Sequence, residues 1–110
     1  MKRLILELGA GNDLYGMDYT KAAKRAVQDA LHHSSLTMFK SLALDSALME
    51  VRVTIGVQDP EQVDLGAVAA TLPRGQANVK AVFGGQNVED GANGTTHVVA
   101  TAAIEAYYPL

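Results

Sequence analysis

The sequence predicts an α+β domain, in which a four-stranded mixed sheet carries two helices on one face, in the order β-α-β-α-β-β. Three observations predict this class. Apolar residues alternate along several short segments, two other segments carry apolar residues at helical spacing, and the two kinds of segment follow one another in turn. Because 110 residues is the size of one domain and no repeat or linker divides the chain, a single domain over 1–110 is expected.

Two strands are predicted from a clear alternation of apolar and other residues. The stronger pattern lies in 48–57, where every odd residue from Met49 to Val57 is apolar. The other lies in 3–9, where leucines at the even positions face one way. The opposite face of that strand is then expected to carry Arg3, Ile5 and Glu7.

Two helices are predicted between the strands. The first is 19–34, with Thr20 or Asp18 as its N-cap. Its apolar positions are mostly alanines, so it is expected to pack closely on the sheet. The second is 59–73, which opens with Asp59 as N-cap and a proline at the first helical position.

The rest of the chain is predicted to complete the sheet. Residues 77–85 read as the third strand and 97–108 as the fourth. Between them, 86–96 is rich in Gly, Asn and Asp, which predicts a hairpin loop. A short helical turn is expected within 35–47, where the pattern is ambiguous.

One face of the sheet is expected to stay free of helices. A mixed face of this kind is either solvated or a subunit interface in which opposite charges pair. The small, alanine-rich core and the 5% aromatic content favour the interface, and with it a homo-oligomer such as a trimer. The residues expected there are Ile5, Glu7, Glu50, Arg52, Thr54, His97, Val99, Thr101 and Glu105.

Composition excludes several classes of partner. The net charge of −3 disfavours nucleic acid and acidic membranes, because both attract clustered Lys and Arg. The chain has no cysteine, which excludes disulfides and thiolate metal sites. The apolar start is too short for a signal sequence or a membrane span. A cytoplasmic protein is therefore expected.

The segment 9–20, GAGNDLYGMDYT, is the candidate site. A carboxylate at a strand end, such as Asp13, is suited to act as a general base or a metal ligand. Tyr15 beside it is a candidate hydrogen-bond donor in catalysis, and Lys21 and Arg25 are candidate contacts for a small anionic ligand. The glycines expected to bind substrate with them are Gly9, Gly11 and Gly16.

The alternative hypothesis is that this segment is only a tight turn. Asp and Gly are the residues that turns prefer, and Asp13 would then bond nearby backbone N–H groups. The dinucleotide fingerprint G-x-G-x-x-G is not met, since Leu14 stands where its third glycine belongs. The sequence does not identify a cofactor or a metal ion.

The segment resembles the signature of a Lin-type conserved-hypothetical family, G-x-G-x-D-x-H-G. Gly9, Gly11, Asp13 and Gly16 match that signature, and the similarity extends to IGVQDPEQVD and to the later GG pair. Tyr15 stands where the family pattern has His, which implies an altered or lost role at that position. The resemblance implies no established activity.

The order of elements is also similar to chorismate-mutase-like and YjgF-like trimeric folds. That similarity implies ligand clefts between subunits. Two functions follow as hypotheses. The first is a small-molecule-binding protein or enzyme with its pocket at 9–20 near a subunit boundary. The second is a non-catalytic homo-oligomeric scaffold in which the same segment is only a turn.

Overall fold

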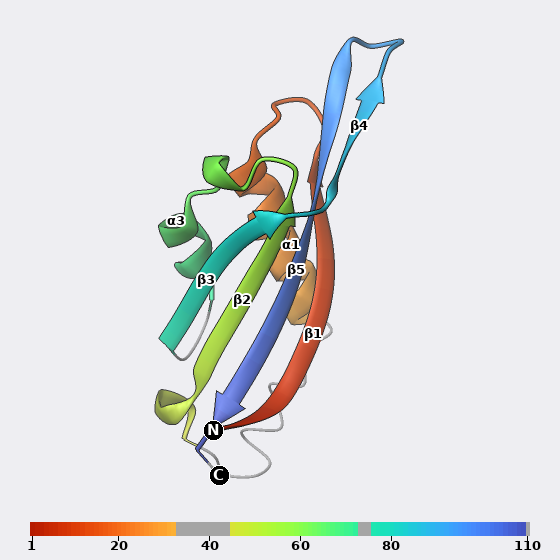
Figure 1. Cartoon of the computed structure of the whole chain (residues 1–110). Coiled ribbons are helices and arrows are strands. Elements are labelled where there is room, and N and C mark those ends of the chain that lie inside the picture. Colours follow the sequence, from red (N-terminus) through yellow and green to blue (C-terminus); the bar gives the residue numbers. More distant parts are fainter. Residues whose placement is uncertain (33–44, 73–75, 110) are drawn as a thin grey trace.

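The computed structural model describes residues 1–32, 45–72 and 76–109. The helical turn expected within 35–47 lies largely outside these residues, and so does the end of each predicted helix. The described chain forms a single mixed sheet with helices on one side (Figure 1). The fold class predicted from the sequence is confirmed, but the number of strands and their order are not.

The sheet has five strands rather than four. Strand β5 is central and runs antiparallel to β1, β2 and β4, whereas β2 and β3 are parallel. The path across the sheet is β1-β5-β2-β3, and β4 pairs with β5 outside this path. The strands are β1 (Lys2–Asp13), β2 (Glu50–Val57), β3 (Gln76–Phe83), β4 (Gln86–Asp90) and β5 (Thr95–Tyr108).

Strand β4 lies in the segment predicted to be a loop. Pairing between β2 and β5 ends at Gly56 opposite Thr101, because β2 stops at Val57. The rest of β5 would be left without a partner on that side, and β4 pairs with it from Gln86 opposite Val99 to Asp90 opposite Thr95. The predicted hairpin therefore exists, but β4 and not β3 is its first strand.

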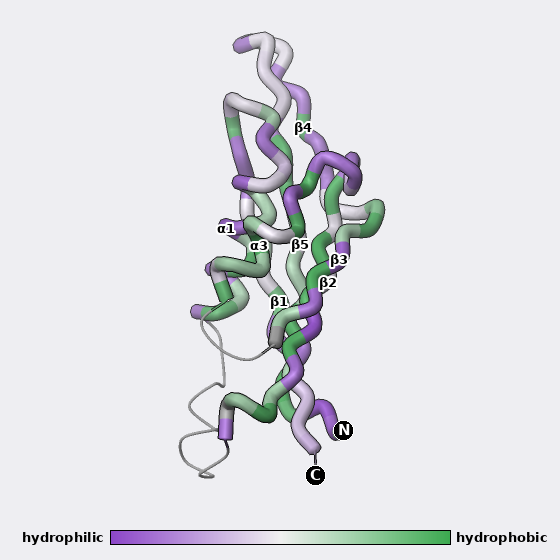
Figure 2. The backbone as a smooth tube through the Cα atoms, turned by 90° about the vertical axis from the view of Figure 1, so that its left-hand side faces the viewer, coloured by the Kyte–Doolittle hydropathy of each residue, from purple (hydrophilic) through white to green (hydrophobic). Residues whose placement is uncertain are grey.

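The helices pack on one face of the sheet, as predicted (Figure 2). Helix α1 (Tyr19–His32) lies against β1 and β5, and the short helix α3 (Leu65–Ala69) lies against β3 and α1. Two 3₁₀ turns occupy Ser46–Leu48 and Pro60–Gln62. In the described residues no helix is long and apolar enough to cross a membrane.

The second predicted helix is broken into two short pieces. Asp59 precedes the 3₁₀ turn but its side chain makes no capping hydrogen bond. The chain then extends through Val63, and Asp64 caps α3 by accepting a hydrogen bond from the backbone N–H of Ala67 at 3.0 Å. The N-cap of the α-helix is therefore five residues later than predicted.

The core is built from small and β-branched side chains, as the composition predicts. Alternate residues of β2 and β5 point toward the helices and are buried there. The alanine stripe of α1 is fully buried against the sheet. The largest fully buried side chains are Val27, Val53, Ile55, Val57, Val68 and Val98.

From Ile5 onward, strand β1 has the opposite orientation to the one predicted. Arg3 precedes a register shift between Arg3 and Ile5, and it bonds Glu105 on the expected face. Ile5 pairs with Ala106 and Glu7 with Ile104, so both lie on the helix face. Leu6 and Leu8 are exposed on the other face. The leucine pattern misleads because the glycines at positions 9 and 11 must lie beneath α1, and their register turns the odd positions of β1 toward the helix.

Candidate functional site

Two regions hold the predicted site residues and the exposed polar groups of the sheet. The first is the connection between β1 and α1. The second is the face of the sheet that no described helix covers, which is called the open face below.

The connection between β1 and α1 is shorter than predicted. Residues 9–13 belong to β1, so only 14–18 join the strand to the helix. Asp13, at the strand end, is 5% exposed. Its Oδ2 accepts hydrogen bonds from the backbone N–H groups of Gly16 at 3.2 Å and Asp18 at 2.9 Å. This carboxylate oxygen therefore organises the turn.

The other oxygen of Asp13 faces the two cations that were predicted to lie nearby. Its Oδ1 is 3.9 Å from Lys21 Nζ and 3.8 Å from an Arg25 guanidinium nitrogen. That same nitrogen of Arg25 donates to the carbonyl oxygen of Asn12 at 2.7 Å. The structure thus brings Asp13, Lys21 and Arg25 together. Their roles toward an anionic ligand stay a prediction.

Asp18 is the residue that caps α1. Its Oδ1 accepts a hydrogen bond from the backbone N–H of Lys21 at 2.9 Å, which satisfies a free donor in the first turn. Thr20, the other predicted cap, has a different role, because its hydroxyl accepts from the backbone N–H of Asp64 at 2.8 Å. Thr20 thereby ties α1 to the start of α3.

Tyr15 is exposed, in contrast to the buried carboxylate of Asp13. It is 77% exposed, and its ring lies edge-on to the ring of His97, with 6.4 Å between the centroids. Tyr15 and His97 thus come together from the turn and from β5, a contact that sequence spacing does not reveal. A catalytic role for Tyr15 stays a prediction.

Gly9 and Gly11 have a packing role that the sequence analysis did not identify. A Cβ on Gly9 would lie 2.4 Å from the backbone nitrogen of Ala30, and one on Gly11 would lie 2.3 Å from that of Ala26. A Cβ on Gly16 would approach Asp13 Oδ2 at 3.1 Å. The first two glycines let the backbones of β1 and α1 touch. Packing alone accounts for these contacts. Substrate binding by the three glycines stays a prediction.

No group of three or more His, Cys, Asp or Glu side chains that would suit a metal ion occurs within 1–32, 45–72 and 76–109. Asp13 has two cations for neighbours, and its Oδ2 is already bonded to the turn. In this geometry Asp13 is better suited to hold the turn than to bind a metal ion.

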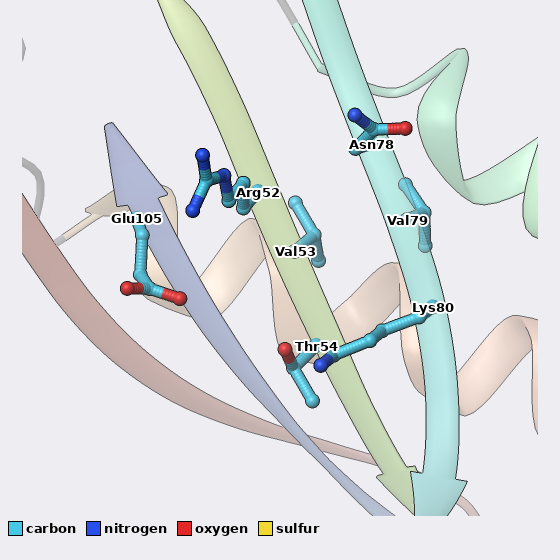
Figure 3. A pocket seen from close by; sticks show the side chains of 7 residues that line it. All are labelled: Arg52, Val53, Thr54, Asn78, Val79, Lys80 and Glu105. Atoms are coloured by element: carbon cyan, nitrogen blue, oxygen red, sulfur yellow. The ribbon is translucent and has the colours of Figure 1, made fainter. Parts of the chain in front are cut away.

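The open face carries most of the polar residues predicted for it. Cross-strand partners share a face, and the register places Glu105 beside Arg52, and Arg52 beside Asn78. The next row joins Ala103, Thr54 and Lys80. Asn78 and Lys80 were not predicted here, although the alternation of 77–85 places them on one side. Figure 3 shows the hollow that is lined by Glu105, Arg52, Asn78, Thr54 and Lys80 together with Val53 and Val79.

Hydrogen bonds and ion pairs fix the charged groups at one end of the open face. Glu105 Oε2 accepts from the Tyr107 hydroxyl at 2.7 Å and from Arg3 at 3.3 Å. Arg52 Nε donates to Glu50 Oε1 at 3.0 Å, and its guanidinium lies over the Tyr107 ring, 4.1 Å from the centroid. The network therefore joins three neighbouring strands.

This network shifts the protonation of its members. The hydrogen bond from Tyr107, with help from Arg3, lowers the pKa of Glu105 below its ordinary value. The same hydrogen bond raises the pKa of Tyr107. The hydrogen bond to Glu50 raises the pKa of Arg52. At neutral pH the carboxylate of Glu105 is therefore ionised, and it holds the phenol in place.

The other end of the open face is apolar. A shallow hollow of about 540 Å³ runs across small residues of β1, β5 and β2, among them Ala10, Ala103 and Gly56. Leu8 and Phe83 border it and are 65% and 74% exposed. A contiguous exposed apolar area of this kind is typical of an interaction surface.

Comparisons with known proteins find one matching family model and a similar solved structure. A family model described as a conserved hypothetical protein (Lin0512_fam) matches residues 3–106. A crystal structure of an FtsZ-like protein of unknown function from Nostoc punctiforme is similar at 31% identity and a TM-score of 0.81. The similarity covers 98% of this chain and 97% of that one. No curated protein matches the chain.

Proposed function

This chain belongs to the Lin0512 family of conserved hypothetical proteins, and we propose that it is a small-molecule-binding protein that works as a homo-oligomer, with subunits that meet through the open face. The observation that carries the proposal is the open face itself. An exposed apolar area and an ordered polar hollow lie side by side on it.

The occupant proposed for the apolar part is a second copy of this chain. Leu6 and Leu8 of β1 and Val82 of β3 are exposed on this face, beside a floor of small side chains. Burying large apolar side chains of this kind contributes roughly 1.5–3 kcal/mol each. A small domain with few aromatic residues gains much of its missing core in this way.

Charge on the open face also suits a copy of itself. Cations and carboxylates alternate across neighbouring strands, from Arg3 and Glu105 to Arg52 and Glu50. A surface that carries both signs can place each sign opposite the other when an identical surface is rotated onto it. A surface of one sign would repel its own copy.

The test is the mass of the protein in solution for Leu8→Asp beside wild type. We expect wild type to elute as an oligomer in size-exclusion chromatography with light scattering, and Leu8→Asp to shift toward the 11.6 kDa monomer. Leu65→Asp is the matched control, because Leu65 is an exposed leucine on α3, on the other side of the sheet. A monomeric wild type, or an unaltered Leu8→Asp oligomer, would overturn the proposal.

A second candidate site is the connection between β1 and α1, favoured by the pair of cations that flank Asp13. Lys21 and Arg25 are both about half-exposed, so an anion can approach them from solvent. In this hypothesis Asp13 acts as base and Tyr15 as hydrogen-bond donor. Titration of wild type and Lys21→Gln with inorganic phosphate, followed by NMR, tests it. Equal responses in the two proteins argue against it.

A further inference from the structure

We propose that the polar hollow on the open face binds a small molecule through an oxyanion, a carboxylate or a phosphate, with Lys80 as the principal cation and Arg52 as the second. This inference deepens the proposed function. It rests on the proposed assembly in one respect, because a second copy of the chain would cover the hollow. It assigns the ligand to the open face rather than to the connection that contains Asp13.

The geometry of the hollow provides hydrogen-bond donors from two strands. Its volume is about 330 Å³, and its polar lining is Arg52, Thr54, Asn78, Lys80 and Glu105. Thr54 lies directly opposite Lys80 in the pairing of β2 with β3, and Arg52 lies opposite Asn78. In Figure 3 the Lys80 side chain extends across the face toward Thr54. An ammonium, a hydroxyl and an amide therefore line one small space.

Lys80 is the charge in the hollow that protein groups leave uncompensated. Arg52 is paired with Glu50, and Glu105 is paired with Arg3. Within the described residues Lys80 forms no ion pair or side-chain hydrogen bond. The five groups therefore sum to one positive charge, although the whole chain carries −3. A local excess of positive charge in an acidic protein favours an anionic ligand.

Arg52 is held in place before any ligand arrives. Its Nε bonds Glu50, and its plane lies over the Tyr107 ring, whose hydroxyl bonds Glu105. Nε of the guanidinium is therefore already bonded, and its terminal nitrogens remain as donors for a ligand. Holding a donor in place reduces the ordering cost of binding.

The one carboxylate that lines the hollow already has protein partners. Glu105 Oε2 accepts two hydrogen bonds, from Tyr107 and Arg3. Two cations, Arg52 and Lys80, line the hollow with this single carboxylate, so the charge balance favours an anionic ligand over a cationic one. A volume of about 330 Å³ is at the lower end of ligand pockets, which favours a small metabolite over a nucleotide.

The experiment is an NMR titration of the full chain with two probes, inorganic phosphate and malonate. We expect the backbone amides of Thr54, Asn78 and Lys80 to shift with saturable, millimolar binding. Lys80→Gln should weaken binding of the better probe at least fivefold. Lys24→Gln on α1 is the control, because it changes the same charge on the helix side, and it should bind as wild type does.

Comparison of the two probes separates the sources of the oxyanion. Stronger malonate binding identifies a carboxylate ligand, and stronger phosphate binding identifies a phosphate ligand, and either result supports the proposal. Equal affinities of Lys80→Gln and wild type would overturn it, as would shifts confined to residues outside the open face. The thermal midpoint of each variant verifies that it is folded.

A third variant separates this inference from the proposed assembly. If Leu8→Asp is monomeric and still shifts the same amides, the hollow is complete in one subunit and both proposals hold. If wild type is monomeric yet binds the probe through Lys80, the proposed assembly is wrong and the proposed site is supported. If wild type assembles but binds neither probe, assembly stands and the site fails.

Discussion

Gly9 and Gly11 are important for packing because they have no side chain. Each lies on the inner side of β1, directly under the backbone of α1. The alanine stripe of α1 is the matching surface, since Ala22, Ala26 and Ala30 are fully buried there. The backbones of β1 and α1 are therefore in direct contact, and no methyl group fits between them.

Replacing Gly9 with Ala is therefore expected to destabilise the protein by about 1–3 kcal/mol, the usual cost of overpacking a core. Urea denaturation followed by circular dichroism measures this change. Gly91→Ala is the control, because no atom lies within 4 Å of a Cβ built at Gly91. That control should be neutral or slightly stabilising. Equal stability of Gly9→Ala and wild type would mean that α1 sits further from β1.

The main role expected for Asp13 is to stabilise the turn between β1 and α1. Asp13→Ala leaves the backbone N–H groups of Gly16 and Asp18 without their acceptor. This should cost on the order of 1–3 kcal/mol in the free energy of unfolding. Asp13→Asn keeps an acceptor oxygen and should lose less. An Asp13→Ala protein as stable as wild type would instead favour a functional role, because active sites often sacrifice stability.

At the connection between β1 and α1, the sequence predicts which residues lie close together. It predicts their roles less well. Lys21 and Arg25 are four residues apart on a helix, so their shared side was predictable. The partners of each Asp13 oxygen depend on the path of 14–18, which includes Met17 with a φ of 48°. A positive φ at a methionine has no sequence signal.

At the scale of elements, β5 carries the network that links Arg3, Glu105 and Tyr107. The lowered pKa of Glu105 means that its ionised form is favoured in the folded state. The resulting stabilisation is present above the unfolded pKa, about 4.3. It is lost as pH falls through the lower folded pKa.

Glu105→Gln should therefore reduce stability at pH 7 and have a smaller effect in acid. The difference in free energy of unfolding between wild type and variant should stay constant above about pH 5 and shrink below about pH 4. Urea denaturation at pH 7, 5 and 3 measures it. Glu61→Gln, in an exposed turn, is the control. A difference that grows toward acid would contradict the assignment.

Two elements show why a sequence pattern can mislead. Strand β4 lies in a Gly- and Asn-rich segment, and it forms because β2 ends early and exposes one side of β5. The segment 9–13 continues β1 for the same kind of reason, since β5 provides partners as far as Val98. Both outcomes depend on a neighbour far away in the sequence, which local propensity does not contain.

The fold also depends on a close crossing that the glycine pair at 84–85 permits. Gly85 has a φ of 59°, and a Cβ on it would lie 2.3 Å from the carbonyl oxygen of Val99. The chain turns here from its place beside β2 to its place beside β5. The pair is also part of the family resemblance, and this close crossing is the physical reason for it.

The whole molecule is long and thin for its size. The radius of gyration is 15.0 Å, and the extents are 53 × 23 × 18 Å. A compact chain of this length has a radius of gyration near 13 Å. In the part of the chain that the structure describes, the helices lie on one side of the sheet, which leaves a large surface per buried residue. Covering the open face with another copy is one way to reduce that surface.

Self-assembly predicts that thermal stability depends on protein concentration. When folded subunits associate and unfolded chains do not, mass action favours the folded oligomer at higher concentration. We therefore expect the thermal midpoint of wild type to rise by several degrees between about 5 and 500 μM chain. Differential scanning calorimetry at three concentrations measures it. Leu8→Asp should show no such rise, whereas Leu65→Asp should follow wild type. A wild-type midpoint that stays constant over this range would mean that the open face of a single subunit is stable in contact with water.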